Sequence, residues 1–369
     1  MADLSVGQPL YKREMRTQLR REKPIEMTRP LLFQKPVAAV CFCLLLIPSS
    51  ALAWSNRGHR MVNLVAAESL PADMPAFMRT PSSVAEISYL GPEPDRWRPG
   101  TEPELSNISS PDHAFRVELG SLASPLPRRR SEFILRLEQL RQSGSADTNL
   151  MRPERIGTLP WQAEEVFERL QSAFRSYRIA TGDLQASAWM DEAPIRAEDL
   201  PYIQSSILYY SGWLGHYIGD GCMPLHDTIN VAGWIEKDNP NGYTRNGSIH
   251  HRLELVADAA IEQHLIQDQR IVSFEASPRL IDDPFATTLQ YLQSEGKYSE
   301  AVYKMEKQGA LEKGGTPELD TFIEHRMAEG AAMLRDLIYT AWVRSKDSKE
   351  PDFPKAVPLV LSRSSREKK

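Results

Sequence analysis

Apolar side chains recur every three or four positions in several windows of this sequence, most clearly at 163–174, 203–218 and 323–341. This spacing places them on one face of an α-helix. Shorter windows with similar character lie at 59–69, 131–142, 249–265 and 283–294. Asp283 and Pro284 are typical of an N-cap and a first helical turn. No convincing run alternates between apolar and polar residues, so the pattern predicts an all-α fold.

Segments rich in Pro, Gly and Ser separate these predicted helices and are expected to be loops. They cover residues 91–112, 144–160 and 227–248. Neither an internal repeat nor a clear boundary divides 54–344, which we expect to form a single helical domain. Residues 345–369 mix charges with prolines and are expected to form a flexible tail.

Residues 1–53 have the features of an N-terminal targeting segment. An apolar run at 37–47 follows basic residues and has eleven residues, whereas a permanent membrane span needs about 20. A small-x-small motif then ends at Ala53. We predict a secretory signal peptide cleaved between Ala53 and Trp54, which makes the protein secreted or periplasmic. The alternative is a short anchor that stays attached, and translation starting at Met27 would give a signal of ordinary length.

Charge and cysteine content limit the possible functions. The formal charge is −5, and residues 1–53 hold eight basic and four acidic side chains, so the remainder carries −9. This balance argues against a broad basic surface for duplex nucleic acid, although it permits a local cationic site. Cleavage would leave Cys222 as the single cysteine, without an internal disulfide. We expect Cys222 to be a buried apolar residue, with metal ligation as the alternative.

Two pairs of residues have a spacing that suits a metal site. His216 and Asp220 are four positions apart, so on a helix they share one face. A proline then ends the helix and lets His226 turn back toward the same region. His250 and Glu254 repeat the four-residue spacing within another amphipathic window. Imidazole and carboxylate ligands suit zinc, while the alternative for each pair alone is a surface hydrogen bond.

Further motifs precede these pairs along the chain. The predicted mature sequence opens with Trp54, and His59 follows a glycine, giving Trp-x-x-x-Gly-His. Asp95 and Arg98 form an Asp-x-x-Arg element, and His113 lies between this element and the first pair. In this order, the motifs resemble the zinc-dependent S-one/P-one single-strand nucleases. That family shares an all-helical fold with bacterial zinc-dependent phospholipase C.

The resemblance implies a cluster of three Zn²⁺ ions. The first ion would be held by Asp95, His113, His216 and Asp220. The second would be held by His226, His250 and Glu254. The third would be held by His59, Asp220, and the terminal amino nitrogen and carbonyl oxygen of Trp54. Signal-peptide cleavage would then complete the site, because an amide nitrogen is a poor metal ligand.

The resemblance also implies catalytic roles. Asp95 and Asp220 would hold ions that lower the pKa of bound water, so that metal-bound hydroxide attacks phosphorus. Arg98 would clamp the non-bridging phosphate oxygens, with a surface ion pair as its alternative role. Trp97 is a candidate for stacking on a base, with loop or core packing as the alternative.

We therefore expect a phosphodiesterase that cleaves single-stranded DNA or RNA to 5′-phosphate products and also removes the phosphate from 3′-nucleotides. A phospholipase C is the alternative enzyme, because Glu254 resembles the phospholipases where nucleases commonly have aspartate. Two further departures from the nuclease pattern bear on base recognition. The segment 227–248 lacks the Gly-Gly-Asn element of many nucleases, and Arg116 stands where the nucleases often place an acid near the phosphate. A third hypothesis is a non-catalytic protein whose zinc only stabilises the fold. The sequence does not indicate an oligomeric state.

Overall fold

The computed structural model describes residues 54–347 except 99, 145–148, 186–193, 275 and 313. All of these residues belong to one compact unit. The predicted signal peptide and nearly all of the predicted tail lie outside the described residues. Regular structure within the described ranges is helical throughout, with one isolated β-bridge between Val231 and Gly233. The all-α prediction is confirmed.

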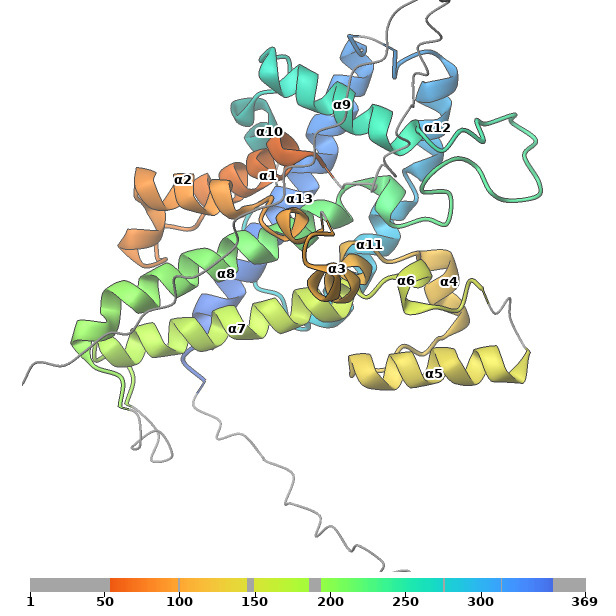
Figure 1. The fold of residues 1–369 in the computed structure, drawn as a ribbon. Helices are drawn as coiled ribbons and strands as arrows, with labels where there is room; N and C mark the ends of the chain where they lie inside the picture. The colour runs from red at the N-terminus through yellow and green to blue at the C-terminus, as the bar shows by residue number, and fades with distance from the viewer. Residues whose placement is uncertain are drawn as a thin grey trace, which may run out of the picture. The chain divides into compact units, whose positions relative to one another are not determined.

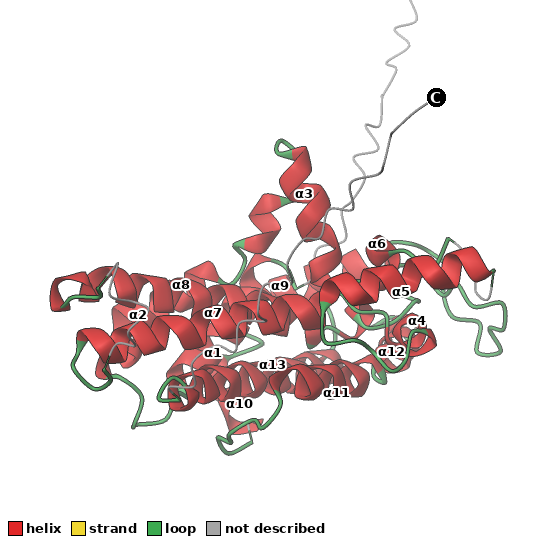
Figure 2. Ribbon diagram, turned by 90° about the horizontal axis from the view of Figure 1, so that it is seen from below, coloured by secondary structure: helices red, strands yellow, loops and turns green. Residues whose placement is uncertain are grey.

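Four helices form the centre of this unit (Figures 1 and 2). They are α1 (Asn56–Glu68), α7 (Leu159–Ala180), α8 (Leu200–Gly221) and α13 (Pro317–Arg344). The neighbouring helices α7 and α8 run antiparallel, and α13 packs against both of them and against α1. The buried face of α13 extends from Leu319 to Ala341. Its length lets one helix support several others, so the core is continuous.

Shorter helices surround this centre. They are α2 (Pro81–Leu90), α3 (Pro103–Ser109), α4 (Val117–Leu122), α5 (Arg130–Ser143), α6 (Pro153–Ile156), α9 (Ile249–Glu262), α10 (Asp268–Phe274), α11 (Pro284–Gly296) and α12 (Ser299–Lys307). The Asp283 side chain accepts a hydrogen bond from the backbone N–H of Ala286, as its N-cap role predicts. None of the helices in the described part of the chain has the length and apolar character of a membrane span.

The expectation of a loop at 91–112 is wrong in part. This segment contains 3-10 turns η2 (Pro94–Trp97) and η3 (Ser110–His113) with α3 between them. In Figure 2 the α3 region projects from the layered helices. A seven-residue helix that begins at a proline shows too few turns for an apolar period to be seen in the sequence. The segment 144–160 likewise contains α6 and the start of α7.

Glycines on one face of α8 allow α1 and α2 to approach closely. A Cβ at Gly215 would collide with the amide of Asn63 on α1, and one at Gly219 would lie 2.9 Å from His59 Nδ1. The Asn63 amide donates hydrogen bonds of 3.0 Å to the carbonyls of Ile87 and Gly212, joining α1, α2 and α8. This contact brings the His59 ring over the last turns of α8.

Candidate metal centre

Five of the predicted ligands converge where α1, η2, η3 and α8 meet. The Asp220 carboxylate lies at the centre: its oxygens are 3.4 Å from His59 Nε2, 3.1 Å from His113 Nδ1 and 3.3 Å from His216 Nε2. Asp95 lies beside them, with carboxylate oxygens 3.7–3.9 Å from the same three nitrogens. The ligand atoms of His59, Asp95 and His216 lie within 4.8 Å of one another, as do those of His113, His216 and Asp220.

Backbone carbonyls orient two of the predicted imidazole ligands, one in each group. His216 Nδ1 lies 2.8 Å from the carbonyl oxygen of Gly91, which directs Nε2 toward Asp220. His226 Nδ1 bonds to the carbonyl oxygen of His113. Such a bond makes Nδ1 the N–H donor and leaves Nε2 with a lone pair, which is the form that ligates metals.

A second group contains the three remaining predicted side chains. His250 and Glu254 lie one turn apart on α9, with Nε2 and Oε1 3.0 Å apart. His226, in the 3-10 turn η6 (Pro224–His226), places its Nε2 3.2 Å from His250 Nε2. His226 Nδ1 is also 3.8 Å from Asp220 Oδ1, so the second group adjoins the first.

Burial dominates the electrostatics of both groups. It raises the pKa of Asp220 to about 6 and that of Glu254 to about 9, because a carboxylate loses hydration there. Burial likewise lowers the pKa values of His59, His113 and His226. At His216 burial acts in the same direction, but Asp220 and Asp95 outweigh it and raise the pKa.

The donor set fits a divalent cation. His59 is fully buried, and among the described residues neither of its ring nitrogens has a hydrogen-bond partner. His250 Nε2 lies 3.2 Å from His226 Nε2 and 3.0 Å from Glu254 Oε1, so two ring nitrogens and a carboxylate oxygen come together at one point. A cation among these nitrogens and carboxylates would give His59 Nε2 a partner and would offset the buried negative charge. His and Asp groups here could therefore bind a metal.

Trp54 and Cys222 lie together beneath this region. The Trp54 side chain is fully buried, and its indole Nε1 donates to Cys222 Sγ over 3.0 Å. Cys222 is buried as expected, and burial raises its thiol pKa, which keeps the sulfur protonated and a poor ligand. The side-chain anchor fixes residue 54 next to α1, while ligation by its amino nitrogen and carbonyl oxygen stays a prediction.

Arg98 and Trp97 border the first group. Arg98 Nη1 lies 3.2 Å from Asp95 Oδ1, so the guanidinium is paired with a predicted ligand. The side chains of Asp95 and Arg98 are 11% and 13% exposed, whereas those of His59, His216 and Asp220 are 0% exposed. Solvent therefore reaches the group from the Asp95 side. Trp97, also on this side, packs edge-on against Trp213 at 5.5 Å between ring centroids.

The structure also reveals supporting residues that the sequence did not indicate. Arg116 donates from Nη1 to the carbonyl oxygen of His226, and Thr158 donates to Asp112 Oδ1 over 2.7 Å, next to His113. The carbonyl oxygen of Gly91, 2.8 Å from His216 Nδ1, supports a predicted ligand in the same way. Backbone carbonyls carry no sequence signal, and Arg116 had been singled out only as a departure from the nuclease pattern.

The remaining histidines lie apart from the two groups or at their edge. His251 is exposed, and its Nδ1 lies 3.5 Å from the outer oxygen of Glu254. His264 and His325 are exposed on other parts of the surface. A scan against protein-family models and a search of curated protein sequences returned no match for this chain.

Proposed function

We propose that this protein is a zinc-dependent phosphodiesterase of the phospholipase C/P-one nuclease fold type, secreted or periplasmic, that cleaves single-stranded nucleic acid and 3′-nucleotides. The observation that carries the proposal is the convergence of eight side chains, from His59 to Glu254 in the sequence, into two adjoining groups. Each of the sequence motifs that predicted a metal site supplies at least one of these side chains. A trinuclear cluster completed by Trp54 belongs to the same proposal.

The proposed reaction is hydrolysis of a phosphodiester. Bound zinc would supply activated water and would neutralise charge on the phosphate. Water adds oxygen to phosphorus, the bond to the 3′ oxygen breaks, and that oxygen gains a proton, which gives a 5′-phosphate and a 3′-hydroxyl. Arg98 lies on the exposed side beside Asp95, where its guanidinium can donate hydrogen bonds to phosphate oxygens.

Asp220 and Asp95 would have different tasks in this reaction. Asp220 has no exposed surface and contacts histidines from both groups, so it would hold the cations without touching substrate. Asp95 is partly exposed, and its Oδ1 lies 3.2 Å from Arg98 Nη1. Asp95 would therefore hold a cation on the side of the centre that faces the substrate. Preorganised charges of this kind lower the barrier because no reorganisation is needed during the reaction.

A phospholipase C is the second candidate, and one observation favours it. Leu105 and Ile108 on α3 are 42% and 69% exposed, and α3 lies between the turns that carry Asp95 and His113. Exposed aliphatic side chains beside a reaction centre could enter a lipid surface. Glu102 and Glu104 precede them in the sequence, which would oppose binding to anionic lipid.

One assay separates these possibilities. The purified protein is offered single-stranded DNA, RNA, 3′-AMP and phosphatidylcholine, each with and without a chelator. Turnover of the nucleic acids that the chelator abolishes supports the proposal. Turnover of phosphatidylcholine alone would establish the second candidate instead. Absence of any chelator-sensitive turnover would leave the metal centre with a structural role.

A further inference from the structure

Aromatic side chains form a row that leads away from the metal centre along α8. Trp97 contacts Trp213, whose ring centroid is 5.8 Å from that of Tyr209 and 6.3 Å from that of Tyr210. Trp213 Nε1 also lies 3.1 Å from the hydroxyl oxygen of Tyr217, which is on the same helix beside His216. The residues Trp97, Trp213, Tyr209 and Tyr210 are each half-buried.

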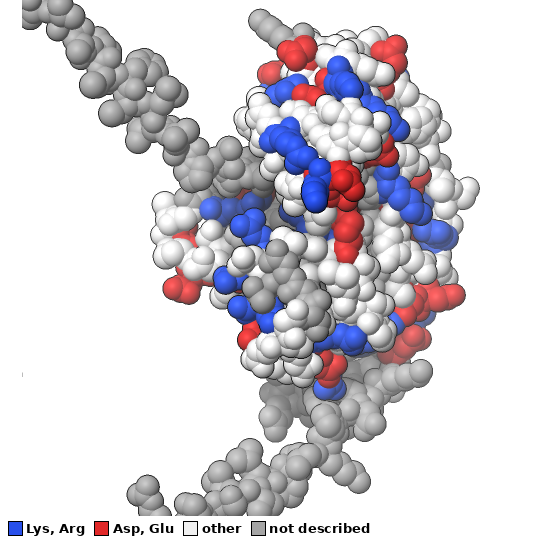
Figure 3. Space-filling model, turned by 90° about the vertical axis from the view of Figure 1, so that its right-hand side faces the viewer, with Lys and Arg blue, Asp and Glu red and all other residues white. Residues whose placement is uncertain are grey.

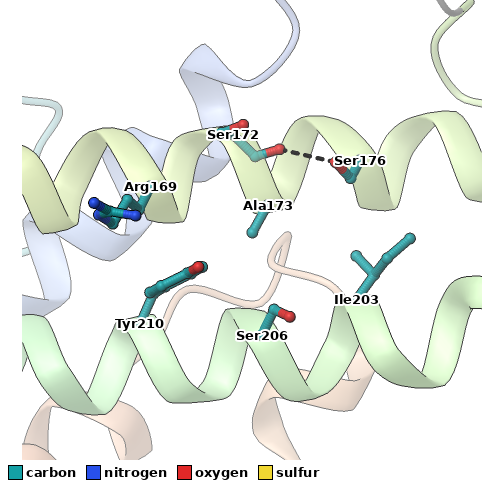
Figure 4. A pocket seen from close by; sticks show the side chains of 7 residues that line it. All are labelled: Arg169, Ser172, Ala173, Ser176, Ile203, Ser206 and Tyr210. Atoms are coloured by element: carbon teal, nitrogen blue, oxygen red, sulfur yellow. Dashed lines mark hydrogen bonds between the residues drawn. The ribbon is translucent and has the colours of Figure 1, made fainter. Parts of the chain in front are cut away.

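The row ends at a groove between α7 and α8 with a volume of about 320 Å³. Figure 4 shows Tyr210 and Arg169 at one end, Ile203 at the other, and serine side chains between them. The volume is at the lower end of the range for small-molecule sites, which suits a group the size of one nucleoside. Tyr210 is six residues before His216 on α8, a rise of about 9 Å.

The groove is suited to a base more than to a phosphate. Arg169 is held by Glu165 on the same helix, with Nη2 2.6 Å from Oε1, so its charge is already balanced. The hydroxyl of Ser206 donates to the carbonyl of Tyr202 over 3.0 Å and keeps its lone pairs as acceptors. A planar group with N–H donors, stacked on Tyr210, matches this lining.

Net charge points in the same direction. The part of the chain after residue 53 carries −9, so its net charge does not favour a polyanion. On the side of α5 and α12, shown in Figure 3, basic and acidic side chains are interspersed. Stacking on aromatic rings is a source of affinity that net charge does not oppose, and it requires unpaired bases.

We propose that the row Trp97–Trp213–Tyr209–Tyr210 and the α7–α8 groove form a subsite for bases of single-stranded nucleic acid, a few nucleotides from the scissile phosphate. This inference rests on the proposed function, since the metal centre fixes where the scissile phosphate lies. The subsite makes longer strands better substrates than dinucleotides, and it selects single strands because bases in a duplex are already stacked and paired.

The test compares thymidine oligonucleotides of two and eight residues as substrates of the purified, zinc-loaded protein. The octanucleotide should show the lower KM. Tyr210→Ala, and Ser206→Trp, which fills the groove, should raise its KM about 5- to 150-fold, the effect of losing one stacked base. Turnover of the dinucleotide should not change. Tyr210→Phe, which keeps the ring, should restore the low KM. Tyr202→Ala, on the exposed first turn of α8, is the matched control.

A binding measurement separates failure of this inference from failure of the proposed function. Fluorescence anisotropy with a labelled phosphorothioate octathymidylate reports the subsite whether or not the protein cleaves nucleic acid. Binding that Tyr210→Ala and Ser206→Trp weaken, and that duplex DNA does not show, supports the subsite. Equal KM values for both lengths, or equal affinity in all variants, would overturn it. Capture by phosphatidylcholine vesicles that depends on Tyr210, without oligonucleotide binding, would also overturn it.

Discussion

At the scale of single residues, Asp220 has the most contacts in the candidate metal centre. Its carboxylate lies 3.1–3.8 Å from nitrogens of four histidines that belong to both groups. It is fully buried, so without a cation its negative charge is unfavourable, and burial raises its pKa to about 6. Asp220 would therefore destabilise the folded protein when the centre is empty, and it would be needed to hold the cation when the centre is occupied.

Replacing Asp220 with Asn tests this double role. The amide has the same shape but no charge, so we expect loss of bound metal and a decrease in rate of at least about 100-fold. The metal-free variant should be at least as stable as the metal-free parent at pH 8, because the buried negative charge at residue 220 is removed. Metal analysis, turnover and thermal unfolding measure these effects. Asp238→Asn, in an exposed loop, should change none of them. Full activity of Asp220→Asn would refute the central role.

Glu164 on α7 gives a pH-dependent prediction outside the metal centre. Burial, followed by repulsion from Glu168, raises its pKa to about 7 from an ordinary 4.5. Between these values the folded protein holds a proton that the unfolded chain has released, so this contribution to stability is lost as pH rises. Glu164→Gln should stabilise the protein by about 1–2 kcal/mol above pH 7, allowing for partial exposure, and leave it unchanged near pH 4.5.

Thermal or urea unfolding of the two proteins at pH 4.5 and pH 8 checks this sign. Glu154→Gln, an exposed side chain on α6, is the control. Stabilisation of equal size at both pH values would show that the amide acts through packing and not through the lost charge.

Much of the candidate site could be predicted at this scale, for a physical reason. A four-residue spacing fixes a shared helix face, so His216 with Asp220 and His250 with Glu254 each lie within 3.3 Å of one another. His113 had no such neighbour, and only the family resemblance placed it. The Gly91 carbonyl that orients His216 could not be foreseen, because every residue has a carbonyl.

At the scale of secondary-structure elements, α8 positions the centre through its small residues. Gly215 and Gly219 allow α1 to approach, and the contact at Gly219 is made by the His59 ring itself. An apolar period in the sequence predicts which face of a helix is buried, but not how closely another helix approaches. The helices α2, α4, α10 and α12 were likewise not predicted, because short helices contain few repeats of that period.

The Gly219→Ala variant tests whether the close approach of α1 to α8 is needed for stability and for metal binding. In an unpacked helix, alanine would stabilise the protein by about 0.5–1 kcal/mol relative to glycine. Here its Cβ would lie 2.9 Å from His59 Nδ1, so the ring must move. We expect a net destabilisation of about 1–3 kcal/mol and a loss of bound metal. Ser205→Ala, on an exposed turn of the same helix, should have neither effect. A more stable Gly219→Ala protein with full metal content would contradict the packing described.

At the scale of the whole molecule, the two groups connect distant segments. Their ligands come from α1, η2, η3, α8, η6 and α9, so a cation bound among them would cross-link elements across the described chain. Described residues include a single cysteine, buried and unpaired, so a disulfide does not supply this link there. Binding to the folded state alone would add about 2.7 kcal/mol when the free metal is 100 times its Kd.

Thermal unfolding with Zn²⁺ and with a chelator measures this coupling. We expect zinc to raise Tm by several degrees and chelation to lower it, because the unfolded chain cannot assemble the groups. The response should be smaller in Asp220→Asn, which removes a shared carboxylate but leaves the group of His226, His250 and Glu254 in place. A Tm that does not depend on zinc would show that the buried histidines and carboxylates are stable without a cation.

The N-terminus provides the last prediction, because it connects export to the proposed chemistry. The Trp54 side chain is anchored against Cys222, and a Cβ at Gly58 would lie 2.7 Å from the Trp54 Cβ. This tight contact fixes the position of residue 54, so an added residue cannot be accommodated by sliding the chain. A protein that begins at Trp54 should bind one more zinc per chain than one with an alanine placed before it, since only a free amine is a good ligand. The extended form should also be about 10- to 100-fold less active. Identical zinc content and rates would remove Trp54 from the ligand set while leaving the two side-chain groups as they are.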